Sequence, residues 1–388
     1  MSDPLPVRTA DVLAVRGQLA IGGRLERGAI VIQRRRIVEI IRDPRDGDLP
    51  DTVVDGAIVA PGLIDLQVNG GFGVEVGDDP AAIRHLAARL PQAGVTAFLP
   101  TVITSPPARY QRVLGVIASA SEGPGARALG LHLEGPFLSP RRAGAHRPEW
   151  MASANDDLFD ALAAYDGLRL MTLAPELPGA PERIRRLRAR EILVSLGHTD
   201  ATYGEVVAGI DAGATMLTHL YNAMSPFEHR APGAVGAGLA DDRVTVGLIA
   251  DGIHCHPASV RMAVRAKGPE RIALVSDMMS AAGMPPGHYE LGGQAVLVDE
   301  AAARLADGTL AGSIVTLDQA ARNAVRWTDA TPAEAILMAS EVPARLLGLT
   351  DTGRIASRCR ADLVLFDDGL NVEATIVGGE IAFVRSTG

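Results

Sequence analysis

The sequence predicts an α/β protein: a (β/α)8 TIM barrel with a small β-sandwich domain built from both chain termini. Eight short apolar segments recur through the middle of the 388-residue chain, and helix-compatible stretches separate most of them. Both ends instead carry Val and Ile runs broken by polar residues, which is typical of β-strands. The main alternative is an open doubly wound sheet. It is disfavoured because no Gly-rich dinucleotide-binding turn follows the first predicted strand.

The eight predicted barrel strands are apolar on both faces, as parallel strands buried between a core and a layer of helices must be. Residues 79–94 represent the helical connections, because Ile83, Leu86 and Leu90 are spaced for one face of a helix. In chain order the predicted strands are 57–65, 94–100, 127–134, 168–176, 191–198, 214–220, 243–251 and 271–277.

The two chain ends predict a separate small domain. Residues 28–43 and 361–384 both have strand-like patterns, and the second stretch contains Gly-Gly as a candidate hairpin turn. Neither end is long enough to form a convincing core alone. We therefore expect residues 1–56 and 354–388 to form one β-sandwich together.

The barrel is expected to span residues 57–353 and to depart from a plain repeat after its eighth strand. Residues 287–313 predict a β-hairpin insertion. The two stretches that follow, 313–327 and 331–348, are compatible with helices.

Composition and charge narrow the classes of partner. Hydrophobic residues make up 47% and charged residues 21%, as in ordinary globular proteins, and the formal net charge is −9. The longest basic run is 34–36, so neither nucleic acid nor an anionic membrane surface is an expected partner. Cys255 and Cys359 offer no disulfide framework. The N-terminus lacks a basic-then-apolar signal and no apolar run approaches a membrane span, so a cytoplasmic protein is expected.

The ends of the predicted strands carry the chemistry, because the active site of a (β/α)8 barrel lies at the C-terminal ends of its strands. Glu134 ends the third strand, His198 the fifth and His219 the sixth. A single strand-end histidine is more often a hydrogen-bonded structural residue. Two histidines and one glutamate facing one bowl are instead the ligand set of a catalytic zinc site with an open position for water. The metal makes that water a good nucleophile near neutral pH.

Asp277 ends the eighth predicted strand and is the candidate general base and acid. It can accept a proton from water and return it to a departing amine. The alternative is an aspartate that caps the next turn.

His132 lies two residues before Glu134, on the same face of the predicted strand. Two interpretations stay open for it: it supports the site, or it is an inert packing residue.

Six motifs together resemble the N-acetylglucosamine-6-phosphate deacetylase family of the amidohydrolase superfamily. The motifs HLEGPF and HLYNAM are specific for the family, whereas PGLID indicates only the superfamily. The resemblance extends through essentially the whole chain and rests on PGLIDLQVNGGFG, HLEGPFLSPRRAGAH, SLGHTDATY, THLYNAMSPFEHRAPG, LIADGIHCHP and LVSDMMSAAG.

The resemblance implies a role for each matching residue. Glu134, His198 and His219 would hold the metal, and Asp277 would be the proton shuttle. His146 would polarise the acetamide carbonyl and stabilise the oxyanion, as preorganised donors do. Contacts to the amino-sugar phosphate, a small-molecule partner, are implied for Ala145, His146, Asn222, Ala223, Arg230, Asp251, His254, Leu310, Ala311 and Gly312. Some family members borrow a phosphate-binding residue from a second subunit, which implies a homodimer.

Gln67 and Asn69 stand where many amidohydrolases carry two histidines, and residues 168–176 contain no bridging lysine. Amide side chains are poor zinc ligands compared with imidazole or carboxylate. We therefore expect one divalent metal per subunit, with Gln67 and Asn69 near an empty second metal position. Zinc is the expected metal, with iron, cobalt and manganese as alternatives.

The implied reaction is hydrolysis of the acetamide of N-acetyl-D-glucosamine 6-phosphate to D-glucosamine 6-phosphate and acetate. The same chemistry on N-acetylgalactosamine 6-phosphate stays open, since no motif reports on the one hydroxyl that differs. A non-catalytic sugar-phosphate-binding barrel is a weaker alternative because all four catalytic and metal residues are present. A cyclic-amide hydrolase is disfavoured by the missing strand-one histidines and lysine.

Overall fold

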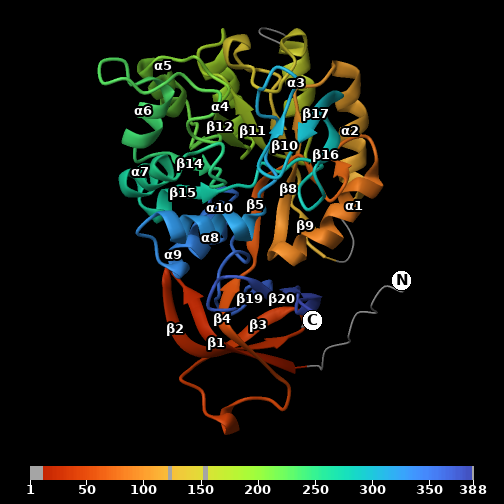
Figure 1. Cartoon of the computed structure of the whole chain (residues 1–388), viewed down its shortest axis with the longest axis vertical. Helices are drawn as coiled ribbons and strands as arrows, with labels where there is room; N and C mark the ends of the chain where they lie inside the picture. Colours follow the sequence, from red (N-terminus) through yellow and green to blue (C-terminus); the bar gives the residue numbers. More distant parts are fainter. Residues whose placement is uncertain (1–11, 121–124, 152–155, 387–388) are drawn as a thin grey trace.

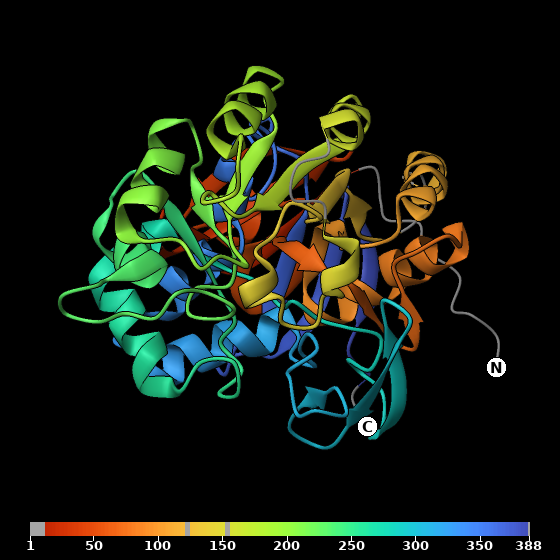
Figure 2. The ribbon, with the colours of Figure 1, turned by 90° about the horizontal axis from the view of Figure 1, so that it is seen from above.

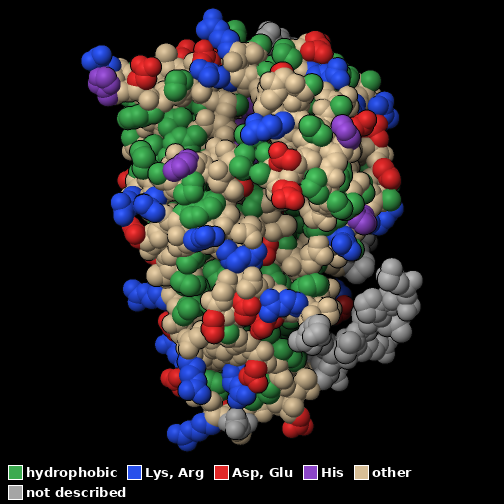
Figure 3. Space-filling view, viewed as in Figure 1, with side chains coloured by type: hydrophobic (Ala, Val, Ile, Leu, Met, Phe, Trp, Pro, Cys, Tyr) green, Lys and Arg blue, Asp and Glu red, His purple; other side chains and the backbone are tan. Residues whose placement is uncertain are grey.

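The computed structural model describes residues 12–120, 125–151 and 156–386, and has a barrel above a smaller sheet (Figure 1). Residues 1–11, on which part of the prediction about a signal sequence rests, lie outside the described residues. No helix among the described residues is long and apolar enough to cross a membrane. On the face shown in Figure 3, basic and acidic side chains are interspersed.

The barrel strands form one parallel sheet, in the order β15-β14-β13-β12-β11-β10-β8-β5. A parallel bridge between Val68 and Met278 joins the two edges, so the predicted (β/α)8 fold is confirmed. The strands are β5 (Leu63–Val68), β8 (Val95–Ile103), β10 (Leu131–Glu134), β11 (Leu168–Leu173), β12 (Leu193–Leu196), β13 (Met216–Leu217), β14 (Thr245–Leu248) and β15 (Ile272–Leu274). The short strand β9 (Arg127–Ala128) pairs with β8.

The first predicted barrel strand, 57–65, is divided between two sheets. Strand β4 (Val53–Pro61) belongs to the small sheet and β5 to the barrel, with Gly62 between them. A Cβ atom on Gly62 would lie 2.1 Å from Oγ1 of Thr96, so only glycine fits where the chain passes from one sheet to the other. Both pieces are apolar, and the pattern of apolar residues therefore carries no sign of the break.

Helices surround the barrel strands in the view from above (Figure 2). Helix α1 shows why they form here: Asp79 caps its first turn by accepting a hydrogen bond from Ala81 N, and Ile83 and Leu86 are buried. The helices are α1 (Pro80–Arg89), α2 (Pro107–Ala120), α3 (Asp156–Ala163), α4 (Ala180–Ala189), α5 (Tyr203–Asp211), α6 (Gly233–Ala240), α7 (Pro257–Lys267), α8 (Leu317–Trp327), α9 (Pro332–Ala339) and α10 (Glu341–Leu346).

The small sheet has seven strands in the order β21-β20-β19-β4-β1-β2-β3 and is drawn from both ends of the chain. Gly378 and Gly379, both with positive φ, form the predicted hairpin turn. The hydrophobic core of the small sheet includes Val15, Ile30 and Leu363. The strands are β1 (Val12–Ile21), β2 (Arg24–Gln33), β3 (Arg36–Arg42), β4, β19 (Leu363–Phe366), β20 (Val372–Val377) and β21 (Glu380–Val384).

The insertion after β15 is an antiparallel sheet of β16 (Gly287–Leu291), β17 (Gln294–Val298) and β18 (Ala303–Arg304). Its hairpin turn is tied to two barrel loops. Glu75 Oε1 accepts a hydrogen bond from Gly292 N at 3.0 Å, and Gln294 Nε2 donates to Ala145 O at 2.6 Å. These contacts make the hairpin a wall of the cavity described below.

Asp362, next to β19, ties the small sheet to the barrel. Its side chain is 1% exposed and accepts hydrogen bonds from Arg127 Nη2 and Arg360 Nε, each at 3.2 Å, and from Gly378 N at 2.7 Å. Arg127 lies on barrel strand β9. Two cations and one backbone donor therefore depend on one buried carboxylate.

We expect Asp362→Ala to lower the free energy of unfolding by about 3 kcal/mol, because it removes the buried carboxylate that faces the partly buried Arg127 and Arg360, although Arg127 keeps its hydrogen bond to Thr352 Oγ1. The matched control is Asp55→Ala. It removes a carboxylate that forms an ion pair with Arg16 but is 63% exposed. This control is expected to cost less than about 1 kcal/mol. Urea unfolding of both variants measures the difference, and equal losses would contradict a special role for Asp362.

Candidate metal centre and active-site cavity

The chain places its functional side chains at or just past the C-terminal ends of four barrel strands. Glu134 is the last residue of β10, and His198 and His219 each lie two residues beyond β12 and β13. Asp277 follows β15. His198, His219 and Asp277 have φ angles of 47°, 30° and 50°, in the left-handed region that side-chain-bearing residues seldom adopt. Backbone strain of this kind gathers at functional sites, where the surrounding structure maintains it.

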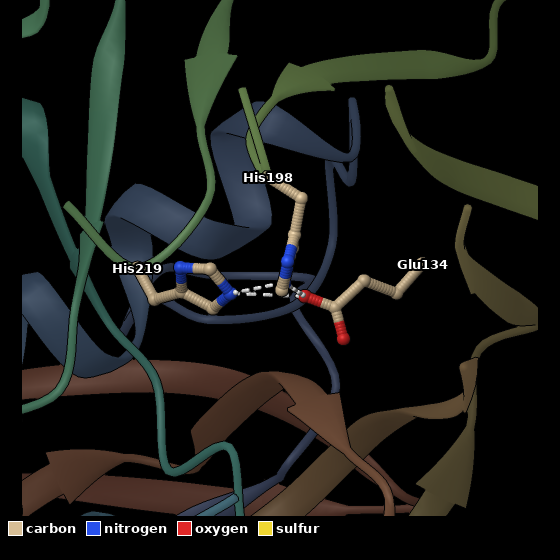
Figure 4. Close-up of side chains that lie close together, drawn as sticks. All are labelled: Glu134, His198 and His219. Carbon is tan, nitrogen blue, oxygen red and sulfur yellow. Dashed lines mark hydrogen bonds and ion pairs between the residues drawn. The ribbon is translucent and has the colours of Figure 1, made fainter. Parts of the chain in front are cut away.

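Glu134, His198 and His219 meet at one point (Figure 4). Glu134 Oε1 lies 3.2 Å from His198 Nε2 and 3.0 Å from His219 Nε2, and the two nitrogens are 3.1 Å apart. All three side chains are buried.

This arrangement fits a divalent metal. His198 Nδ1 lies 2.9 Å from the carbonyl oxygen of Arg142, to which it donates, so the Nε2 of the neutral ring carries a lone pair. Ligand atoms at 2.0–2.1 Å from a tetrahedral zinc would be about 3.3 Å apart, close to the separations seen here. The residues therefore crowd three electron-rich atoms together in the way that a cation requires.

The electrostatics keep the carboxylate of Glu134 ionised. Although burial opposes it, the imidazoles of His146, His198 and His219 hold the pKa of Glu134 well below its usual range. At His219, burial lowers the pKa of the imidazole, but the carboxylate of Glu134 outweighs burial and raises it. Nδ1 of His219 has no hydrogen-bond partner among the described residues.

His146 lies in the loop after β10, with its Nε2 3.6 Å from Glu134 Oε2. Its ring centre is 4.3 Å from that of His198. Burial, followed by the neighbouring His198, lowers the pKa of His146 to about 4, so the ring is neutral at physiological pH. A neutral imidazole beside the metal ligands can donate a hydrogen bond but carries no charge.

Asp277 and the two amides are linked to the same centre. Asn69 Nδ2 donates to Asp277 Oδ1 at 2.7 Å, and Gln67 Nε2 donates to Glu134 Oε1 at 3.0 Å. Burial and the nearby charge of Glu134 raise the pKa of Asp277 to about 6. A carboxyl group that titrates near neutral pH suits proton transfer in both directions.

A cavity of about 370 Å³ opens over this centre. Twelve of the residues predicted from the sequence line it: Asn69, Glu134, Ala145, His146, His198, His219, Asn222, Ala223, His254, Asp277, Leu310 and Gly312. Four predicted residues, Gln67, Arg230, Asp251 and Ala311, are not among its lining residues. Sequence reasoning missed seven lining residues, which come from the end of β8, from the loop after β10 and from the insertion: Ile103, Arg141, Arg142, Ala143, Gly144, Leu291 and Thr309.

Asp251 lies behind the cavity wall and orients His254. Its Oδ2 is 2.7 Å from His254 Nδ1, and its Oδ1 accepts from the backbone N of His254 at 2.7 Å. Although burial opposes it, the contact with His254 holds the pKa of Asp251 below its usual range. The Nδ1–H of His254 therefore faces Asp251.

Arg141 and Arg142 add positive charge at the cavity. Arg142 Nε donates to Asp200 Oδ1 at 2.8 Å, and Arg141 Nη1 lies 3.4 Å from Asp200 Oδ2. One carboxylate faces two guanidinium groups, which leaves one unit of positive charge in a chain with a formal charge of −9. This cluster suits an anionic group on a ligand.

Comparison with known proteins agrees with this geometry. The amidohydrolase family profile matches residues 58–382. The chain belongs to the amidohydrolase family. An N-acetylgalactosamine-6-phosphate deacetylase of Escherichia coli O157:H7 is 43% identical, covering 84% of this chain and 88% of the relative. An N-acetylglucosamine-6-phosphate deacetylase of Bos taurus is 42% identical, covering 93% and 90%.

Solved structures give the same relationship. The N-acetylglucosamine-6-phosphate deacetylase of Pasteurella multocida superposes with a TM-score of 0.91 at 31% identity, covering 96% of this chain and 100% of the other. A mutant deacetylase of Mycobacterium smegmatis, solved with N-acetyl-D-glucosamine-6-phosphate, has a TM-score of 0.91 at 34% identity, covering 97% and 100%. Family membership together with the triad supports a divalent metal in this amidohydrolase.

A chain of buried polar side chains lies inside the barrel of this amidohydrolase, close to the metal ligands. His132 Nδ1 is 3.3 Å from Thr101 Oγ1, and its Nε2 is 2.8 Å from Thr172 Oγ1. Thr218 continues the chain, 2.8 Å from Thr172 and 2.6 Å from Ser195. Burial lowers the pKa of His132 to about 4, so its ring is neutral. His132 is therefore part of a hydrogen-bonded network and not an inert packing residue.

Asp65 on β5 is a further buried carboxyl group, to which sequence reasoning assigned no role. Its Oδ1 accepts from Gln67 N and from Ser276 N, each at 3.2 Å, while Oδ2 has no partner among the described residues. Burial raises the pKa of Asp65 to about 7. The protonated form is therefore favoured by the fold.

Because the folded pKa of Asp65 lies above its unfolded value, its contribution to stability is complete at acid pH and is lost as pH rises toward 7. Asp65→Asn mimics the protonated carboxyl group and does not titrate. From pH 5 to pH 8 the variant should gain roughly 2–3 kcal/mol of unfolding free energy relative to the parent. Urea unfolding at both pH values measures this, and parallel pH profiles would contradict it.

Proposed function

We propose that this amidohydrolase hydrolyses the acetamide of N-acetyl-D-glucosamine 6-phosphate to D-glucosamine 6-phosphate and acetate. The observation that carries the proposal is the convergence of Glu134, His198 and His219 within 3.0–3.2 Å of one another, in a cavity that Asp277 and His146 also line. Relatives that cover most of this chain and carry that name support the choice of substrate.

Glu134, His198 and His219 would hold one divalent metal per subunit, zinc in the first instance. A metal bound there polarises an amide carbonyl and makes water a better nucleophile. The structure's contribution is to prepare the ligands. Arg142 O fixes the tautomer of His198, and Gln67 holds Glu134 in place. Such outer contacts orient ligands and tune their basicity.

Asp277 would take a proton from the attacking water and deliver it to the departing amine. Asn69 holds one of its oxygens at 2.7 Å, which leaves the other for proton transfer. Its pKa of about 6 lets it act as base first and acid second. His146, neutral and buried, would donate a hydrogen bond to the carbonyl oxygen as negative charge develops there.

The sugar phosphate would lie between Asn222, Ala223 and His254, with Leu310 and Gly312 covering the hexosamine. The positive charge that Arg141 and Arg142 leave over Asp200 supports an anionic group in the same cavity. Guanidinium groups bind phosphate oxygens through paired hydrogen bonds.

A second candidate is the N-acetylgalactosamine 6-phosphate deacetylase reaction. The observation in its favour is the 43% identity to a relative of that name. The two sugars differ at one hydroxyl, so the ratio of kcat/KM values on the two phosphates distinguishes the two activities.

We expect Asp277→Asn to release acetate from N-acetyl-D-glucosamine 6-phosphate at less than about one-thousandth of the parental rate, because the proton shuttle is lost. Asn keeps the shape of the side chain, so metal analysis should still give one ion per chain. The matched control is Asp251→Asn, a carboxylate outside the cavity lining, with a milder effect. Full turnover by the Asp277 variant, or no acetate release by the metal-loaded parent, would contradict the proposal.

We further propose a homodimer in which Arg230 reaches the cavity of the partner. Arg230 is exposed and is not among the residues that line the cavity of its own chain. Phe227 in the same loop is 58% exposed. An exposed aromatic next to a cation is typical of a residue pair that a partner surface covers.

Mixing Arg230→Ala with Asp277→Asn tests this arrangement. Each variant alone should be nearly inactive. If Arg230 acts in the partner's cavity, mixed dimers regain one complete site, about one quarter of all sites on random exchange. Mixing His146→Ala with Asp277→Asn is the control, because both residues line the cavity of their own chain. No recovery in the first mixture, with dimer exchange shown by light scattering of tagged subunits, would contradict the proposal.

A further inference from the structure

Glu176 holds the chain immediately after His198. It lies in the loop that follows β11 and is half-buried. Its Oε2 accepts a hydrogen bond from Oγ1 of Thr199 at 2.5 Å, and its Oε1 accepts one from the backbone N of Asp200 at 2.7 Å. Both oxygens of one carboxylate therefore contact the two residues that follow a candidate metal ligand. Hydrogen bonds to carboxylates at such distances are among the stronger ones in proteins.

The backbone at His198 needs this support, because its φ is +47°. A residue with a side chain keeps that conformation only where the surrounding structure imposes it. The imidazole of His198 meets Glu134 and His219 from this turn (Figure 4). The hydrogen bonds of Glu176 fix the direction in which the chain leaves His198, and that direction in turn sets where the imidazole points.

Thr199 passes the constraint to the loop that contains His219. Thr199 is fully buried. Its backbone N donates to Ala223 O at 3.0 Å, and its backbone O accepts from Ser225 N at 2.9 Å. The loops that carry both imidazole ligands are thus joined at the residue whose hydroxyl donates to Glu176.

Asp200 extends the contact toward the third candidate ligand. Its backbone N donates to Glu176, and its side chain accepts from Arg142 Nε at 2.8 Å. Arg142 lies in the loop after β10, the strand that ends at Glu134. Glu176 therefore joins its own loop to the loops after β10, β12 and β13, the strands that bring the three candidate ligands to the centre.

The position of Glu176 is itself fixed by the residues before it. The backbone N of Ala174 donates to Phe137 O, in the loop after β10, at 2.9 Å. Pro175 packs against helix α5, where a Cβ atom on Gly209 would lie 3.0 Å from the Cβ of the proline. The carboxylate of Glu176 thus projects from a packed segment and can act as a fixed point.

We propose that Glu176 is a positioning residue for the metal site: it holds Thr199 and Asp200 so that the imidazole of His198 lies in place before a metal binds. The inference rests on the metal site of the proposed function. Glu176 belongs neither to the ligand triad nor to the cavity lining, so it acts through His198. Without Glu176 the metal should bind more weakly, because an outer contact that orients a ligand is lost.

Two variants of Glu176 separate its contacts from its charge. Glu176→Ala removes both acceptors. Glu176→Gln keeps the shape of the side chain, and the new amide can accept from Asp200 N and donate to Thr199 Oγ1. If the contacts position His198, the amide should restore what alanine loses.

The matched control is Glu334→Ala. Glu334 is also half-buried, and its Oε2 accepts from the same two kinds of group, the backbone N and the Oγ1 of Thr331, at 2.7 and 2.9 Å. It lies on α9, which contacts β1 and β2 of the small sheet (Figure 1). This control therefore removes a similar pair of hydrogen bonds away from the metal centre.

Three measurements on metal-free protein distinguish positioning from general support of the fold. Competition with a zinc-binding dye, with zinc alone as the probe, gives metal affinity. The visible spectrum after loading with cobalt(II) reports the geometry of the ligands. The melting temperature, Tm, reports the stability of the fold, which a merely structural glutamate would also change.

Glu176→Ala should bind zinc about 10–100-fold more weakly than the parent, the range typical for loss of an outer contact to a metal ligand. Its cobalt spectrum should differ from that of the parent. Glu176→Gln should keep nearly parental zinc affinity and the parental spectrum. Glu334→Ala should lower Tm but change neither zinc affinity nor the spectrum.

Thr199→Val supplies an independent test, because it removes only the hydroxyl that donates to Glu176. It should also weaken zinc binding, by less than Glu176→Ala does. In the double variant the two losses should not add, since both substitutions break the same contact. If Glu176→Ala does not fold, parental zinc affinity in Thr199→Val would overturn the proposal.

Three further results would overturn the proposal: parental zinc affinity in Glu176→Ala, an equal loss of affinity in Glu334→Ala, or a parent that binds no zinc. Failure of the proposed reaction is separate, since it would show as a zinc-loaded parent that releases no acetate. The zinc and cobalt measurements would still decide the role of Glu176 in that case.

Discussion

The active site depends on one unfavourable arrangement, in which Glu134 Oε1 and the Nε2 atoms of His198 and His219 lie within 3.0–3.2 Å of one another. Without a cation between them, these three atoms avoid repulsion only where they share a proton, and the raised pKa of His219 beside Glu134 reflects this. The barrel tolerates the arrangement because each side chain comes from a different strand and is held by other contacts. Arg142 O fixes one imidazole, and Gln67 donates to the carboxylate. The fold thus holds ligands that would separate if they were free to move.

The backbone bears part of the cost of this convergence. His198, His219 and Asp277 all adopt left-handed φ angles immediately after their strands. Each such residue costs of order 1 kcal/mol, which the packed barrel must supply. The turn takes the side chain out of the alternation of the strand and points it at the centre. Strand β13 accordingly ends at Leu217, two residues before His219, although the strand predicted from the sequence runs to Leu220.

The sequence predicts the fold class and the metal ligands because both follow from residues at regular places. Eight apolar segments mark the strands, and a ligand at a strand end needs no knowledge of the loops. The lining by Arg142 and Leu291 could not be foreseen, since it depends on how a loop and an inserted hairpin fold over the barrel. The hydroxyls around His132 also escape notice, because serine and threonine on separate strands carry no pattern until the strands are adjacent. Arg230 shows the converse limit: a motif names the residue, but Arg230 is not among the residues that line the cavity of its own chain.

The amides at Gln67 and Asn69 are consistent with the proposal of a single metal at this site. Carboxylate oxygens only accept, so the amide nitrogens must face Glu134 at 3.0 Å and Asp277 at 2.7 Å. Amide hydrogens, each with a partial positive charge, therefore occupy the region where a second cation would have to approach. They favour the ionised form of both carboxylates without competing for the metal. The two amides thus orient Glu134, a candidate metal ligand, and Asp277, the proposed proton shuttle.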